Sequence, residues 1–314
     1  MSTTNTAEDT VRHSFEARGP LHVDAQLRAS SLHLTAAETD EVTVEVTPSK
    51  GFYLNADPME VIVEYSANTL RIEVPESEGG GLKIGPIQLG SFTSHRYSIT
   101  VRVPEHSSLK AHTGSGRITT TGVLEQASAK CGSGRISVEQ AREVYARTGS
   151  GAITVGQADR LEANAGSGGI VVETVTEAQL TAGSGDIRVN SSPGHLQLKT
   201  GSGDIRLGNI AGAGALAGSG DIEVAHLSGN LNAKTGSGDV TVQCAVSGQI
   251  HSTAASGDIT VGVPTGTAVL QDCSTVSGRL RSELQGTDAP AETEHQLELH
   301  ARTVSGDIAL RRAG

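Results

Sequence analysis

Aromatic side chains are almost absent from this sequence. Its 314 residues include no Trp, three Phe and four Tyr, and only Tyr145 lies between residues 111 and 314. Enzymes that cleave polysaccharides bind sugar rings on aromatic platforms and act through paired carboxylates. The shortage of aromatics therefore ranks a carbohydrate-active enzyme below a non-enzymatic function.

Long apolar runs and helical periodicity are missing as well. No stretch of 18 or more apolar residues occurs, and a membrane-spanning helix needs about 20. Residues 1–10 are polar and lack the apolar centre of a signal peptide. We expect a disordered tail at residues 1–10, no membrane insertion and a cytoplasmic protein.

Basic residues are outnumbered and cysteines are few. Lys and Arg total 24 against 35 Asp and Glu, which gives a net charge of -11. Without a basic cluster, nucleic-acid binding is disfavoured. The odd set Cys131, Cys244 and Cys273 indicates reduced thiols, and Cys131 and Cys273 fall at expected inward positions, where we interpret them as small core residues.

One phrase, Gly-Ser-Gly, is repeated along most of the chain. Successive serines of the complete phrases lie 17 or 18 residues apart, and later Ser-Gly pairs continue the series at Ser256, Ser277 and Ser305. A fixed period of this size is typical of a solenoid. The serines of the complete phrases are Ser115, Ser133, Ser150, Ser167, Ser184, Ser202, Ser219 and Ser237.

Apolar and polar residues alternate on both sides of each phrase. In the repeat around Ser202, Leu196, Leu198 and Thr200 precede the turn, and Ile205 and Leu207 follow it. A period of two indicates two half-buried strands per repeat. Glycine would allow the reversal between them by adopting positive φ. Small residues before the turn and large ones after it would fill a thin core.

These patterns predict an all-β fold, a two-layered β-solenoid with repeats of about 17 to 18 residues. A flat antiparallel meander is the alternative, but open twisted sheets rarely exceed roughly ten strands. Residues 11–110 alternate without the period and form an N-terminal β cap. Residues 111–314 form the solenoid, and its last coil caps the C-terminal end, where Arg311 and Arg312 would close the edge with charge.

No catalytic, cofactor-binding or metal-binding residues are predicted. A solenoid would stack metal ligands in one column, yet His112, His195, His226 and His251 stand at different distances from their nearest serines. A serine nucleophile elbow needs Gly-x-Ser-x-Gly on a strand-to-helix turn. The repeated serine fits a turn-forming hydroxyl better.

The residue after each Gly-Ser-Gly changes from basic to acidic along the chain. Neighbouring aspartates about 4.8 Å apart would repel one another, so the column must be solvated, hydrogen-bonded or neutralised by cations. We expect each carboxylate to cap its own turn and face water and not to bind calcium. The column runs Arg117, Arg135, Ala152, Gly169, Asp186, Asp204, Asp221, Asp239 and Asp258.

Residues 196–205 and 231–240, with the phrase Thr-Gly-Ser-Gly-Asp before Ile or Val, resemble the bacterial β-strand repeat proteins called putative adhesins, a domain family of unknown function. Residues 97–104 are similar to that family's lead-in to its first coil, and the likeness covers about residues 15–312. The resemblance implies a β-solenoid of bacterial origin. Some of its relatives are surface or envelope-stress proteins.

The sequence therefore predicts a non-enzymatic structural or protein-interaction module. Its partner would be an unidentified protein or a second copy of the chain. The alternatives are a self-assembling intracellular scaffold and a carbohydrate-active β-helix enzyme.

Overall fold

The computed structural model describes residues 3–7, 10–49, 57, 60–75, 82–84, 87–89, 96–284 and 295–313. Within these ranges the chain forms strands, turns and bends, and no α-helix occurs. The described residues thus include no helix long and apolar enough to cross a membrane. The predicted all-β class is confirmed. The chain divides into two compact units, residues 1–154 and 155–314.

The strands of unit 1 pair in two layers, except β8 and β9, which pair with each other in a separate antiparallel sheet. In the first layer β1, β2, β5 and β10 pair antiparallel, and β4 and the first half of β12 continue it in parallel. In the second layer β6 pairs antiparallel with β7, and β3, β11 and the second half of β12 follow in parallel. The strands are β1 (Thr3–Ala7), β2 (Thr10–Glu16), β3 (His22–Gln26), β4 (Ser31–Ala37), β5 (Glu41–Pro48), β6 (Ile62–Ser66), β7 (Thr69–Glu73), β8 (Leu82–Ile84), β9 (Ile87–Leu89), β10 (Tyr97–Pro104), β11 (Ser108–Thr113), β12 (Ile118–Cys131) and β13 (Ile136–Thr148).

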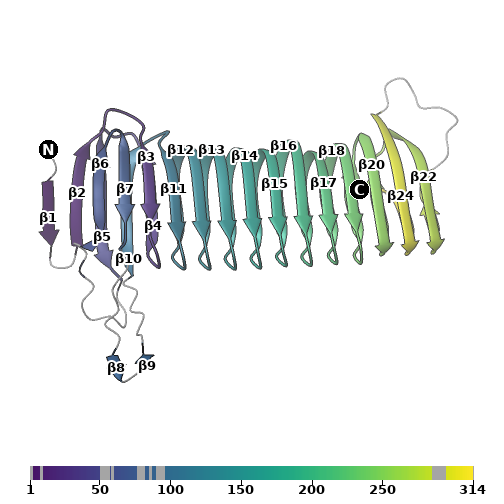
Figure 1. The fold of residues 1–314 in the computed structure, drawn as a ribbon. Helices are drawn as coiled ribbons and strands as arrows, with labels where there is room; N and C mark the ends of the chain where they lie inside the picture. Colours follow the sequence, from purple (N-terminus) through teal and green to yellow (C-terminus); the bar gives the residue numbers. More distant parts are fainter. Residues whose placement is uncertain are drawn as a thin grey trace. The chain divides into compact units, whose positions relative to one another are not determined.

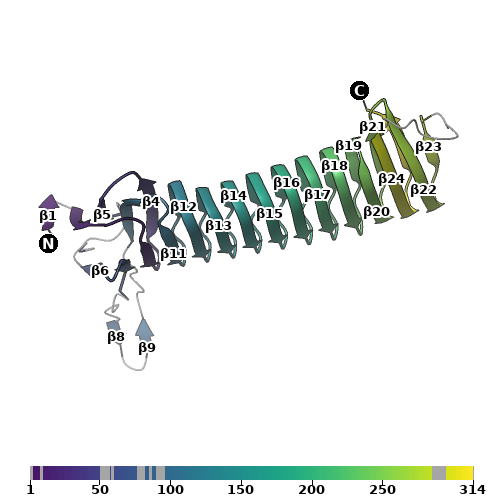
Figure 2. The same ribbon diagram turned by 90° about the horizontal axis from the view of Figure 1, so that it is seen from above.

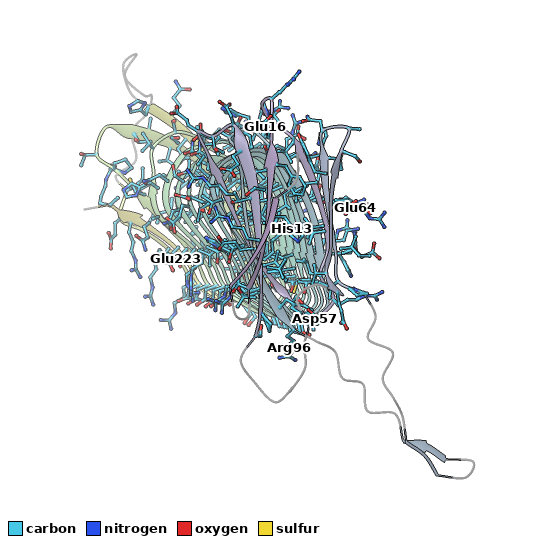
Figure 3. The ribbon with its side chains drawn as sticks, turned by 90° about the vertical axis from the view of Figure 1, so that its left-hand side faces the viewer. His13, Glu16, Asp57, Glu64, Arg96 and Glu223 are labelled. Carbon is cyan, nitrogen blue, oxygen red and sulfur yellow. The ribbon has the colours of Figure 1, made fainter. Side chains whose placement is uncertain are left out.

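The N-terminal end of unit 1 is closed by irregular strands and rings. The Phe15 ring lies 5.5 Å from the Tyr65 ring and stacks on His13 at 6.4 Å, measured between centroids. Figure 3 faces this end and labels His13, Glu16 and Glu64. The contact between the half-buried rings of Phe15 and Tyr65 joins β2 of the first layer to β6 of the second.

The predicted domain boundaries lie at residues 10 and 110. The expected disordered tail at residues 1–10 includes Thr3–Ala7, which the structure places in β1, paired with β2. The boundary at residue 110 stays a prediction. The strands β3 and β4 stack in parallel directly on β11 and β12, and they belong to the same compact unit as the first coils.

Unit 2 contains the later repeats, and β14 (Ile153–Ala165) extends across the division. Figure 1 shows β15 to β18 side by side. The remaining strands are β15 (Ile170–Ala182), β16 (Ile187–Thr200), β17 (Ile205–Ala217), β18 (Ile222–Thr235), β19 (Val240–Ala245), β20 (Gly248–Ser256), β21 (Ile259–Val263), β22 (Thr267–Ser277), β23 (Leu280–Ser282), β24 (His295–Ser305) and β25 (Ile308–Arg312).

Each long strand of unit 2 serves both layers, as β18 illustrates. Its first half pairs in parallel with β19 and its second half with β20, and Figure 2 shows β19 and β20 in opposite layers. Like residues stack on like, so Ile187, Ile205 and Ile222 are direct partners and all are fully buried. The predicted solenoid and its inward columns are confirmed.

The last coils of unit 2 do not follow chain order. β24 pairs on one side with β20 and on the other with β22, and β25 lies in the same way between β21 and β23. Along the chain, the end coil of β22 and β23 comes first. The strands β24 and β25 then return to lie between this end coil and the coil of β20 and β21. The expectation that the last coil in sequence caps the solenoid is wrong, because β22 and β23 form the edge.

Candidate functional site

The repeated turn is built around a hydroxyl two residues before the serine. Thr200 Oγ1 donates a hydrogen bond of 3.0 Å to the Gly185 carbonyl oxygen of the preceding coil, and it accepts one of 3.2 Å from the Gly203 amide. Thr113 and Thr148 make the same pair of contacts in unit 1. The side chain thus supplies a partner to two backbone groups that the turn leaves out of the sheet.

Cys131 occupies this position in its coil. Its Sγ lies 3.3 Å from the Gly116 carbonyl oxygen and accepts a hydrogen bond from the Gly134 amide. Burial raises the pKa of this thiol. The structure places Cys131 in the core, as the sequence interpretation has it, whereas Cys273 is half-buried at an inward position of the end strand β22.

The glycines of the complete phrases serve a purpose that the sequence interpretation missed. The described glycines with positive φ are Gly19, Gly122, Gly248, Gly257, Gly266 and Gly306, and none belongs to a complete Gly-Ser-Gly. A Cβ atom added to Gly203 would instead overlap the backbone of Gly185 in the preceding coil. The expectation of positive φ is therefore wrong at these positions, which need glycine because neighbouring turns stack in contact.

The aspartates after the turns form a continuous hydrogen-bonded ladder. Oδ1 of Asp186 accepts a bond of 3.0 Å from the amide of Asp204, and Oδ1 of Asp204 accepts one of 3.0 Å from the amide of Asp221. Asp239 and Asp258 continue the series at 2.8 Å. Because of the coil order, Asp307 joins as a sixth aspartate, and its carboxylate accepts from the Arg279 amide.

The ladder corrects the expected role of the column. Each carboxylate caps the amide of the neighbouring coil and not of its own turn, because the 17 to 19 residue period places that amide directly beside it. The second oxygen of Asp186 faces Arg188 at 3.5 Å and Arg206 at 3.3 Å, and Asp204 binds Arg206 at 2.7 Å. These ion pairs lower the repulsion at this end of the row.

The ladder predicts that two substitutions of Asp221 differ in their effect on the free energy of unfolding. Asp221→Ala removes the acceptor of the Asp239 amide and should cost about 1.5 kcal/mol of unfolding free energy. Asp221→Asn keeps an oxygen acceptor and removes one of the stacked negative charges, so stability should be unchanged or higher at low salt. Denaturant unfolding at low and high salt measures both. Equal losses in the two variants would contradict the ladder.

Calcium is expected to have no effect on stability. Among the described residues no group of three or more His, Cys, Asp or Glu side chains is placed to hold a metal ion. One oxygen of each ladder aspartate is already used by a backbone amide. Thermal melts with millimolar calcium and with chelator should coincide, and a large rise in Tm with calcium would reverse this interpretation.

The structure brings together two histidines that the sequence interpretation left apart. The rings of His251 and His300 stack with centroids 4.6 Å apart because β20 pairs with β24. His300 also lies 2.9 Å from Glu298 and 3.2 Å from Asp272. Both histidines stand five residues before their serines, Ser256 and Ser305. That shared offset was the available signal, although sequence order hides their adjacency. His112, His195 and His226 do not join this group.

The His300 cluster predicts a pH-dependent stability. Hydrogen bonds to Glu298 and then to Asp272 raise the pKa of His300, and the bond from His300 lowers the pKa of Glu298. The charged His300 therefore stabilises the fold fully below its unfolded pKa of 6.5, and this contribution is lost as pH rises through the raised folded value.

Below the unfolded Glu298 pKa of 4.5 the pair weakens again, as pH falls through the lowered folded value. His300→Gln should lower Tm more at about pH 5.5 than at about pH 8.5. Arg302 and His251 also face this cluster and remain in the variant. An equal loss of Tm at both pH values would show that His300 is not charged in the fold.

Two of the hollows on the surface of unit 2 have volumes of about 300 and 330 Å³. One, of about 300 Å³, follows the bend between layers and is mainly apolar, with Ile210, Leu227 and Val246 in its lining. The other, of about 330 Å³, is lined by Asp258, Asp307, Arg281 and Glu283, among others. Both are shallow, and the polar residues in them continue the repeated columns. Arg188, Arg206 and Glu223 are neighbours on one outward face (Figure 3 labels Glu223), where Arg206 lies 3.9 Å from Glu223.

Several solved structures are similar to this chain. The chain is similar to a crystal structure of a "putative adhesin" from Parabacteroides merdae, with 9% identity, 96% of each chain covered and a TM-score of 0.44. A second "putative adhesin", from Parabacteroides distasonis, has 12% identity, 96% coverage of each chain and a TM-score of 0.42. A "putative lipid binding protein" from the same species has 14% identity, covers 82% of this chain and 94% of its own, and has a TM-score of 0.38.

No curated protein matches the sequence. The family model described as Toastrack DUF4097 matches residues 22–217 and again residues 216–311. These matches include both the N-terminal coils and the Gly-Ser-Gly array, and the family's function is unknown. The chain therefore belongs to the Toastrack DUF4097 family.

Proposed function

We propose that this protein is a non-enzymatic interaction module that binds a protein partner through an outward face of unit 2. The observation that carries the proposal is the ion-pair network over β16 to β18, in which Arg206 contacts Asp186, Asp204 and Glu223. Because each coil repeats the same positions, the network presents charges of both signs at a regular spacing on one flat surface.

The placement of the charges supports recognition over catalysis. Catalytic carboxylates act in pairs around one scissile bond, inside a cleft that excludes water. Here Asp186 and Asp204 belong to one column of stacked aspartates, Glu223 stacks beside Arg206, and the three side chains are 29% to 43% exposed. Charged groups arranged in this way set the orientation and the rate of protein association.

Capture of partners from lysate of the native host tests the proposal. The variant Arg188→Ser, Arg206→Ser, Glu223→Ser should unfold within about 1 kcal/mol of the wild type, since exposed ion pairs contribute little, and should retain less of the captured partner. The matched control, Lys199→Thr with Lys234→Thr, changes outward residues of the other layer of the same unit and should retain it fully.

The outcome separates this proposal from its alternatives. Loss of the partner in both variants would show that the network face has no special role. Hydrolysis of polysaccharides by the purified protein, abolished by replacement of one carboxylate, would replace the proposal with a carbohydrate-active enzyme.

A further inference from the structure

The end coil of unit 2 exposes the apolar side chains of Leu270, Val276 and Leu280. Leu280 is 50% exposed, whereas its direct partner Ile308 is fully buried. Leu270 is 68% exposed and Val276 83%. Within the described part of the chain, no strand pairs with the free edge of β22 or β23. The end coil therefore leaves both the core and the sheet edge open.

This edge lacks the charges that normally protect one. Natural edge strands carry Lys, Pro or inward charges that prevent further strand pairing. The outward positions of β22 are Ala268, Leu270, Asp272, Ser274 and Val276, with one charge among five residues. Those of the neighbouring β24 are Gln296, Glu298, His300, Arg302 and Val304. β22 therefore carries fewer outward charges than the strand with which it pairs, and its free edge has little charge to prevent further pairing.

We propose that a second copy of this chain covers the edge, with a two-fold axis that runs perpendicular to the sheets through Cys273 and Ser282. A two-fold arrangement uses the same surface twice and forms a closed dimer. It pairs β22 antiparallel with β22 of the second copy, and β23 with β23. Both layers of the solenoid then continue across the axis.

The position of the axis follows from the pairs that it creates. With Cys273 on the axis, Leu270 lies opposite Val276 of the second copy, so that two exposed apolar side chains cover each other. Asp272 then lies opposite Ser274. Moving the axis by one residue to Asp272 would place two aspartates directly opposite each other, which destabilises a sheet.

The second layer selects the same axis. Counting outward from the turn at Ser277 and Gly278, Cys273 lies across the core from Ser282. With Ser282 on the axis, Arg281 of each copy lies opposite Glu283 of the other copy, which gives two equivalent ion pairs. An axis at residue 281 would place the two copies of Arg281 opposite each other, and an axis at residue 283 would do the same to the two copies of Glu283. Within one copy Arg281 lies 3.8 Å from Asp307, and the Glu283 amide donates to the Leu310 carbonyl oxygen.

The axis brings the two copies of Cys273 together. Residues directly opposite in an antiparallel pair have Cα atoms about 4.5 to 5.5 Å apart, which lies within the range that a disulfide spans. Cys273 thus reports the register directly. Burial raises the pKa of its thiol, so oxidation is best carried out at alkaline pH.

Sedimentation and cross-linking of the full chain test the dimer. We expect a concentration-dependent dimer and, on mild oxidation, a disulfide-linked dimer that Cys273→Ser abolishes and Cys131→Thr with Cys244→Ser retains. Leu270→Lys with Val276→Lys should weaken association at least tenfold, by about 1.4 kcal/mol or more. Leu216→Lys, on an exposed apolar residue away from this edge, should not.

Charge reversal tests the register without relying on the cysteine. Arg281→Glu should weaken the dimer, and the double variant Arg281→Glu, Glu283→Arg should restore it. A protein that stays monomeric at all accessible concentrations would overturn the proposal, as would open filaments. A dimer without Cys273 cross-linking and without rescue by the double variant would reject this axis.

Discussion

Replacing Gly203 by alanine is expected to lower the free energy of unfolding by about 3 kcal/mol, near the upper end of the cost of overpacking. The added Cβ would overlap the carbonyl group of Gly185 and approach the amide of Asp186. These are backbone atoms held by hydrogen bonds of the stacked turn, so they cannot move aside as a flexible side chain would. The neighbouring coils must separate locally, with loss of the bonds that Thr200 makes there.

Gly214 offers a matched control in the next coil. A Cβ added there would meet only the end of the Gln197 side chain, at 3.3 Å, and Gly214 does not have positive φ. Gly214→Ala should therefore be neutral or slightly stabilising, since alanine restricts the unfolded chain. Urea denaturation of both variants gives the comparison. Similar stabilities for the two would show that the stacked turns do not require glycine.

The order of the last coils predicts the second large effect. Ile308→Ala should cost about 4 kcal/mol, because Ile308 is fully buried between Ile259 and Leu280 and its removal leaves a cavity. Leu280→Ala should cost less than about 1 kcal/mol, because half of that side chain already meets solvent. Both are measured by denaturant unfolding at a protein concentration low enough to keep the chain monomeric.

The comparison distinguishes the observed coil order from sequence order. If the coils followed the sequence, Leu280 would lie between Ile259 and Ile308, and Leu280→Ala would be the costly change. A larger loss for Leu280→Ala than for Ile308→Ala would therefore contradict the return of β24 and β25 to the inner place.

Local patterns determined the strands, the inward columns and the family. Thr200, Ile205 and Leu207 are buried as their alternation indicates, because the side-chain period of a strand is fixed by backbone geometry and needs no knowledge of neighbours. The 17 or 18 residue spacing determined the stacking, since only a constant period keeps like residues in register from coil to coil. The ion-pair face of Arg188, Arg206 and Glu223 follows from the same columns.

What the tertiary structure decided concerns contacts between coils. The close stacking of one turn on the next explains why Gly203 needs space and not positive φ. It also determines that the Asp186 carboxylate caps the amide of Asp204 in the neighbouring coil. The pairing of His251 with His300, and the exposed Leu270, depend on coil order. The order of the coils in space cannot be read from their order in the sequence. Any coil of matching period can stack in parallel on a neighbour, so the period does not determine the order of the last coils. The observed order places the apolar Leu297, Leu299 and Ile308 inside the solenoid, where they are buried, and leaves the more polar β22 at the end.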